Sequence, residues 1–145
     1  MNDETIIKIH WSFWLIGVMS LLWHAGGCIN YLMQTNPEVV VQLPATHRAI
    51  IEGRPEWATG GFAIGVFVGA LASFLLLLRK SSAIYAFILA MAGIVLTMIH
   101  TINVVTSGVQ FTAAEVFFMV VLPIIVTGIL IWYSKQCRVK GWLSD

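Results

Sequence analysis

Six polar or titratable side chains stand within or beside long apolar stretches of this chain. Polar groups in such stretches are costly and usually face the interior of a helix bundle. Two of the six, His24 and His100, could ligate a haem or a metal ion. Together with Glu115 they could instead relay protons. A third possibility is recognition of a small polar or amphipathic ligand, which suits amide and aromatic groups, here those of Asn30, Tyr31, His100 and Asn103.

Each of these chemical roles has a structural alternative. The two histidines could join helices by hydrogen bonds, and Glu115 could cap the positive end of a helix. The spacing of the histidines matches no ligand signature, so the sequence leaves any cofactor or metal unknown. There is no nucleophile–base motif, no Gly-rich phosphate loop and no carboxylate pair inside an apolar stretch. We therefore expect a protein that is not an enzyme.

The composition indicates that the solvent of this chain is lipid. Of 145 residues, 59% are hydrophobic and 10% are charged, whereas about 25% are charged in a typical soluble domain. So few charges cannot cover a water-soluble globule. Eight Lys and Arg are balanced by seven Asp and Glu, and no basic run exceeds a pair, so nucleic-acid binding is not expected. The expected partner is the lipid bilayer.

Four apolar stretches are long enough to cross that bilayer, which takes about 20 residues of helix. They predict an all-α protein, a four-transmembrane-helix bundle that forms a single integral membrane domain over 1–145. The stretches cover residues 11–33, 57–78, 83–105 and 113–133.

The basic residues predict the orientation of the bundle. Six Lys and Arg flank the stretches on the side of the two termini, and two lie in the opposite loops. Because Lys and Arg are in excess in cytoplasmic loops, both termini are expected inside. The predicted location is the inner membrane of a bacterium, in a multi-pass arrangement.

The one long connection, residues 34–56, is then expected outside. Asn36 is placed to cap a short helix through 39–43. Thr46 is placed to cap a second one over 47–52. We expect two short amphipathic helices on the outer face, with an ordinary solvated connector as the alternative.

With this orientation the polar side chains within the spans are unevenly distributed between the two halves of the membrane. His24, Asn30, His100, Asn103 and Glu115 all fall in the outer half of the bundle, whereas the inner half is nearly all apolar. This distribution predicts a pocket that opens outward and closes inward. A water-filled pore would need polar lining along its whole length, so a simple channel is not expected.

A series of small residues marks the second stretch. Gly61, Gly65, Gly69 and Ser73 follow one another at intervals of four, a pattern that lets another helix approach closely. The main interpretation is packing within the bundle. The alternative is that the same face forms a homodimer or binds another membrane protein.

Several short segments also resemble a group of small bacterial four-span inner-membrane proteins that are often labelled "sugar transporter". The similar segments are residues 10–17 (HWSFWLIG), 30–33 (NYLM), 55–57 (PEW), 75–80 (LLLLRK) and 97–100 (TMIH). The resemblance implies a role in transport, and DoxX-like four-helix proteins share the general architecture. That group often has an aspartate where this chain has Asn30, so the resemblance carries no proton-coupling role to this position.

Three functional hypotheses follow. The leading one is a small-molecule transporter or transport accessory, with a sugar as the substrate implied by the resemblance. The second is a haem- or metal-binding redox subunit that depends on His24 and His100. The third is a non-catalytic structural partner in a larger membrane complex, which would dock through the small residues around Gly65.

Overall fold

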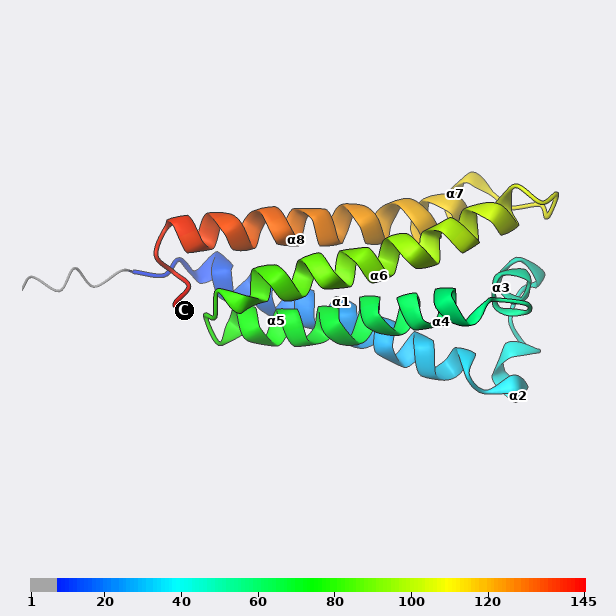
Figure 1. Cartoon of the computed structure of the whole chain (residues 1–145), viewed down its shortest axis with the longest axis horizontal. Coiled ribbons are helices and arrows are strands. Elements are labelled where there is room, and N and C mark those ends of the chain that lie inside the picture. Colours follow the sequence, from blue (N-terminus) through cyan, green and yellow to red (C-terminus); the bar gives the residue numbers. More distant parts are fainter. Residues whose placement is uncertain (1–7) are drawn as a thin grey trace, which may run out of the picture.

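The computed structural model describes residues 8–145 and confirms the predicted helical bundle. Residues 1–7, the first part of the predicted domain 1–145, lie outside the described residues. Four long helices run side by side (Figure 1) and all are long and apolar enough to cross a membrane. This is therefore an integral membrane protein. The spans are Trp11–Gln34, Glu56–Leu77, Ser82–Val105 and Ala113–Val139, so the fourth continues beyond the predicted end at residue 133.

Two of the spans are interrupted by a π-helical turn. The first span is the single helix α1 (Trp11–Gln34) and the third is α6 (Ser82–Val105). The second and fourth spans each have three parts, because a wider turn is inserted between two α-helical segments. These parts are α4 (Glu56–Ala63), η1 (Ile64–Val68) and α5 (Gly69–Leu77) in the second span, and α7 (Ala113–Val116), η2 (Phe117–Val121) and α8 (Leu122–Val139) in the fourth.

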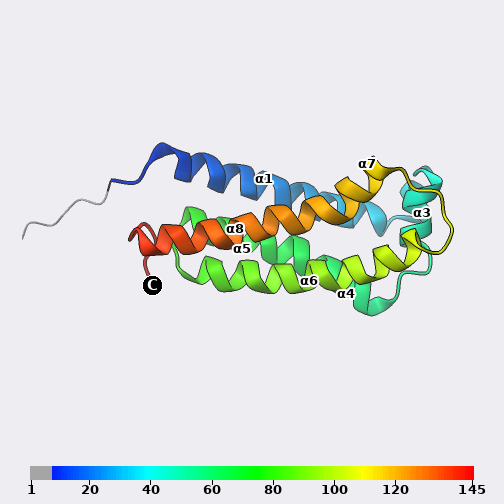
Figure 2. The same cartoon turned by 90° about the horizontal axis from the view of Figure 1, so that it is seen from above.

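Helix α6 lies at the centre of the arrangement. It packs against α4, η1 and α5 on one side and against α8 on the other, while α1 packs against α5 and η1. The first and fourth spans are accordingly the least buried of the four. Figure 2 shows α1 and α8 running along the same side of the molecule. Because extensive helix packing does not join these two, the bundle is left open between them.

The small residues of the second span are used inside the chain. A Cβ atom built on Gly61 would lie 2.9 Å from the carbonyl oxygen of Gly93, and one on Gly65 would lie 2.9 Å from Cγ1 of Ile94. Both glycines thus allow close approach to α6. Gly69 and Ser73 instead face α1. All four positions are buried, so this face is not open to a second copy or to another protein.

One end of the bundle, which we call the tail end, contains residue 8 and the segment 140–145. A packed hydrophobic core lies there. Its buried members come from all four spans and from the tail segment; they are Phe13, Ala72, Leu76, Ala83, Phe87, Leu130, Cys137 and Leu143. The tail segment 140–145 is fastened over this core by hydrogen bonds to the α5–α6 turn. The Ser144 amide donates to the Arg79 carbonyl at 2.7 Å, and the Ser81 amide donates to the Ser144 carbonyl at 2.8 Å.

The opposite end, the loop end, carries the two short helices that the sequence predicts. The first, α2 (Pro37–Val40), has Pro37 at its first helical position and ends before the predicted limit at residue 43. As predicted, the side chain of Asn36 caps it by accepting a hydrogen bond from the Glu38 amide at 3.0 Å. The second, α3 (Ala45–Ile51), begins after Pro44. The prediction that Thr46 caps this helix is wrong, because Thr46 lies inside it and its hydroxyl donates to Glu115 Oε1 at 2.7 Å.

Candidate functional site

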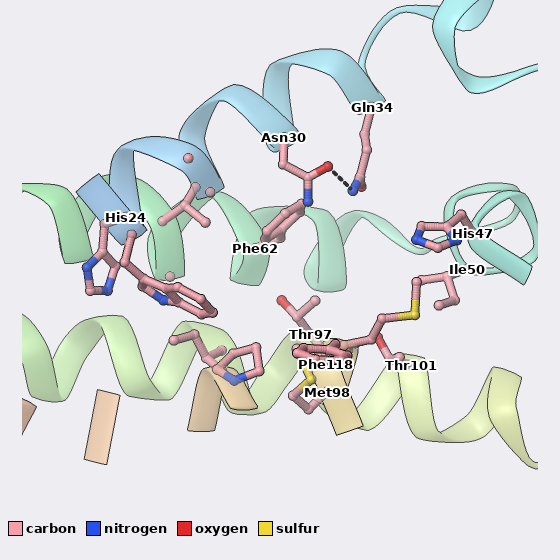
Figure 3. Close-up of a pocket in the computed structure, with 18 of the residues that line it drawn as sticks. His24, Asn30, Gln34, His47, Ile50, Phe62, Thr97, Met98, Thr101 and Phe118 are labelled. Carbon is pink, nitrogen blue, oxygen red and sulfur yellow. Dashed lines mark hydrogen bonds between the residues drawn. The ribbon is translucent and has the colours of Figure 1, made fainter. Parts of the chain in front are cut away.

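A cavity of about 520 Å³ lies at the loop end, between the first, second, third and fourth spans (Figure 3). The α1 wall contains Trp23 and Asn30, and the loop helix α3 contributes His47. Phe62 lines the cavity from α4 and Phe118 from η2. The volume is in the range typical of small-molecule sites. The tail end, by contrast, is filled by the core described above.

A chain of hydrogen bonds orders the mouth of the cavity. Arg54 Nη2 donates to Gln34 Oε1 at 2.7 Å, and Gln34 Nε2 donates to Asn30 Oδ1 at 3.2 Å. Since a guanidinium can only donate, this chain fixes the orientation of both amides. The NH₂ group of Asn30 is therefore left as a donor, and Figure 3 shows it pointing toward Phe62 and the cavity.

The mouth carries the positive charge of the Arg54 guanidinium. Arg54 and His47 line the cavity, and no aspartate or glutamate does. Within residues 8–145, the one ion pair joins Arg138 and Asp145 at the tail end. Burial lowers the pKa of the Arg54 guanidinium from its ordinary value and the nearby Tyr31 opposes this, but an arginine stays protonated in proteins. A ligand group with negative charge or with acceptor atoms suits this mouth.

The deeper walls offer little hydrogen bonding. Thr97 and Thr101 line the cavity, yet both hydroxyls are used within the bundle. Thr97 Oγ1 donates to the carbonyl oxygens of Gly93 at 3.1 Å and Ala58 at 3.2 Å, and Thr101 Oγ1 donates to the Thr97 carbonyl at 3.1 Å. The remaining lining is mostly aliphatic, aromatic or methionine. The site thus combines a polar mouth with an apolar interior.

His24 lies at the inner end of the cavity and is only 2% exposed. Its Nδ1 lies 2.9 Å from the Ser20 carbonyl oxygen and 3.2 Å from Ser73 Oγ. Because a carbonyl oxygen can only accept, Nδ1 carries the hydrogen. The Nε2 atom is buried without a hydrogen-bond partner in the described structure, and the ring rests on Gly69. His24 therefore joins α1 to α5 at the inner end of the cavity.

His100 does not line the cavity. Its Nε2 lies 3.0 Å from the Ile50 carbonyl oxygen and its ring meets Trp57 edge-on, with 6.4 Å between the ring centroids. His100 thereby holds α3 against α6. Asn103 is exposed near the C-terminal end of α6. Tyr31 is half-buried and makes edge contacts with aromatic rings of the second span, Phe62 and Phe67.

Glu115 caps the fourth span and links it to α3 by a hydrogen bond. Its Oε2 accepts a hydrogen bond from the Thr112 amide at 2.8 Å, and its own amide donates to Thr112 Oγ1 at 3.2 Å, which forms a capping box at the start of the fourth span. The other carboxylate oxygen, Oε1, accepts the hydrogen bond that the Thr46 hydroxyl donates. Of the six side chains considered from the sequence, the structure places His24 and Asn30 on the cavity wall and the other four elsewhere.

Two side chains that line the cavity, Gln34 and Arg54, were not proposed as site residues from the sequence. Gln34 had a usable signal, because it follows Asn30 by four residues and so lies on the same face of α1. Arg54 was used only to predict orientation. Its pairing with Gln34 depends on how the loop returns to α1, which residue spacing does not show.

The geometry does not gather ligands for a metal. Among residues 8–145 there is no group of three or more His, Cys, Asp or Glu side chains that could hold a metal ion, and Cys28 and Cys137 are free. The chain was compared with protein-family models, with curated proteins and with solved structures, and none of them matches it. The functional interpretation therefore rests on the cavity itself.

Proposed function

We propose that this integral membrane protein transports a small molecule, or assists its transport, and that the molecule binds in the cavity at the loop end. The observation that carries the proposal is the contrast between the two ends of the bundle. The loop end holds a cavity of about 520 Å³ with an ordered polar mouth, whereas the tail end is a packed core. A site that is accessible at one end and closed at the other fits substrate capture.

The distribution of Lys and Arg supports an outward-facing mouth. In that orientation the loop end lies outside a bacterial inner membrane, and the tail end faces the cytoplasm. The resemblance to four-span proteins labelled as transporters agrees with this role. The apolar interior of the cavity offers few of the hydrogen-bonding partners that a sugar would require.

The two alternative functions find less support. A haem or metal between His24 and His100 would require two rings that share a space, but each ring is held by a different backbone carbonyl and only His24 lines the cavity. A docking role through the small residues of the second span would require an exposed face. Gly61, Gly65 and Gly69 are instead buried within the chain.

The proposal can be tested by filling the cavity. Gly26 lines it, and a Cβ atom built there meets nothing within 4 Å, so Gly26→Trp is expected to occupy the site without displacing a neighbouring helix. Gly60 is equally open but does not line the cavity, which makes Gly60→Trp the matched control. Both proteins would be purified in nanodiscs and examined by native mass spectrometry for a co-purifying small molecule.

We expect the molecule to be present in the wild-type protein and in Gly60→Trp, and lost in Gly26→Trp. The identified molecule would then be supplied to proteoliposomes, where uptake above that of protein-free vesicles is expected. Retention of the molecule by Gly26→Trp would contradict the assignment of the site. Uptake no faster than in empty vesicles would contradict the transport step.

A further inference from the structure

A second cavity, of about 380 Å³, lies between α1 and α8 on the tail side of the first. Its lining is almost wholly apolar and includes Leu15 and Met19 from α1 and Ile129 from α8. Trp23 lines both cavities, so they adjoin at its side chain. We call these two neighbouring cavities along α1 the groove. The first has a polar mouth that carries the Arg54 guanidinium, and the second has apolar walls.

This groove faces the surrounding lipid. Leu15, Met19 and Ile129 are 51%, 57% and 56% exposed, and Trp23 is 40% exposed. Since α1 and α8 are not joined by extensive packing, a molecule can enter sideways between them without passing through water. Lipid chains are as apolar as these side chains, so a bilayer does not drive the groove closed.

The length of the groove and the charge at its mouth indicate which class of molecule it can bind. From Asn30 to Leu15 the groove follows α1 for about 22 Å at 1.5 Å per residue, which exceeds the ~15 Å of hydrocarbon in one leaflet. The groove is therefore long enough for one extended acyl chain. At the mouth, Arg54 and the free NH₂ group of Asn30 offer only donors, and no carboxylate lines either cavity. This combination matches an anionic headgroup.

We propose that the protein binds a single-chain anionic lipid from the surrounding bilayer, with its headgroup at Arg54 and Asn30 and its acyl chain in the groove between α1 and α8. This inference rests on the proposed function and names the class of molecule that the cavity receives. A two-chain lipid would need a second groove beside the first. A sugar would leave the apolar groove without a role.

The probe is palmitate, titrated into the protein in phosphatidylcholine nanodiscs and measured by native mass spectrometry. Arg54→Gln removes the charge at the mouth, whereas Arg54→Lys keeps it. We expect palmitate to bind at least tenfold more weakly to Arg54→Gln, a loss of about 1.4 kcal/mol, and nearly normally to Arg54→Lys. Methyl palmitate, which lacks the charge, should distinguish little between these variants.

A second pair of variants tests the chain site. Ile129→Trp fills the groove, while Ile88→Trp makes the same change at an exposed position on α6 that lines neither cavity. We expect Ile129→Trp to weaken palmitate at least tenfold and Ile88→Trp to leave it unchanged. This pair remains decisive even if Arg54→Gln fails to fold.

The outcomes separate the inference from the proposed function. If the cavity binds a soluble polar molecule such as glucose, sensitively to Gly26→Trp, and palmitate does not bind, the lipid inference is overturned and the proposed function stands. If neither palmitate nor any co-purifying molecule binds, both are overturned. Palmitate binding that ignores both Ile129→Trp and Arg54→Gln would also overturn the inference.

Discussion

Replacing Gly69 by alanine should destabilise the bundle through the His24 ring. An added methyl at this position would lie 2.5 Å from His24 Nε2 and would also overlap Cδ2. Such a contact is not tolerated, so either the ring or α5 must shift. The ring is the nearer obstacle, and moving it breaks the hydrogen bond from Nδ1 to the Ser20 carbonyl oxygen.

The size of the effect follows from three terms. Forcing an extra methyl into a packed site costs about 1–3 kcal/mol. Losing one buried hydrogen bond costs about 1 kcal/mol. The change from glycine to alanine within a helix returns roughly 0.5–1 kcal/mol. Gly69→Ala is therefore expected to lower the free energy of unfolding by about 1–3 kcal/mol.

The assay is reversible unfolding in mixed micelles, followed by circular dichroism. Gly60→Ala is the matched control, because nothing lies within 4 Å of a methyl at that helical position and the change should be neutral or slightly stabilising. In a His24→Ala background, Gly69→Ala should cost much less, since the obstructing ring is gone. The reasoning is refuted if Gly69→Ala behaves like Gly60→Ala, or if its cost is the same with and without the His24 ring.

Three further changes should each have a distinct result. Trp142→Ala removes the ring that meets Phe13 edge-on at the tail end, so unfolding should become easier by about 2 kcal/mol; unchanged stability would show that the tail segment contributes nothing. Thr46→Val removes the hydrogen bond to Glu115 and should cost about 1 kcal/mol, with faster amide exchange confined to α3 rather than spread over the bundle. Gly53→Ala places a side chain at φ +78° and should cost about 1–2 kcal/mol, opposite in sign to Gly60→Ala in the same unfolding assay.

Hydropathy was sufficient to predict the spans because crossing a membrane requires an uninterrupted apolar segment of known length. The Asn36 cap was predictable for a similarly local reason, since a side-chain oxygen needs to reach only two residues along the chain. The π-helical turns η1 and η2 were not predictable in this way. An apolar segment has the same hydropathy whether its amides bond four or five residues back, so hydropathy carries no signal for a π-helical turn.

The candidate site was predicted less completely than the spans. His24 lies on the buried face of α1, which a helical wheel shows from spacing alone, and Asn30 lies beside that face. The partner of His100 is a backbone carbonyl of α3, and every residue has such a group, so residue types gave no signal. The hydrogen bond from Arg54 to Gln34 likewise depends on how the loop between them folds, because the two residues are far apart in the sequence.

The fastening of the tail segment determines where this bundle can flex. Ser144 bonds to Arg79 and Ser81 in the α5–α6 turn, and the Arg79 side chain donates to the Trp142 carbonyl, so we expect this end of the bundle to move least. A rotation of about 5° there would move the far end of a helix as long as α1 by about 3 Å. At the loop end α4 stays packed against α6 through Gly61 and Gly93, whereas α1 makes few contacts with α4. We therefore expect the widest movement for α1 beside the mouth of the cavity and the smallest at the tail end.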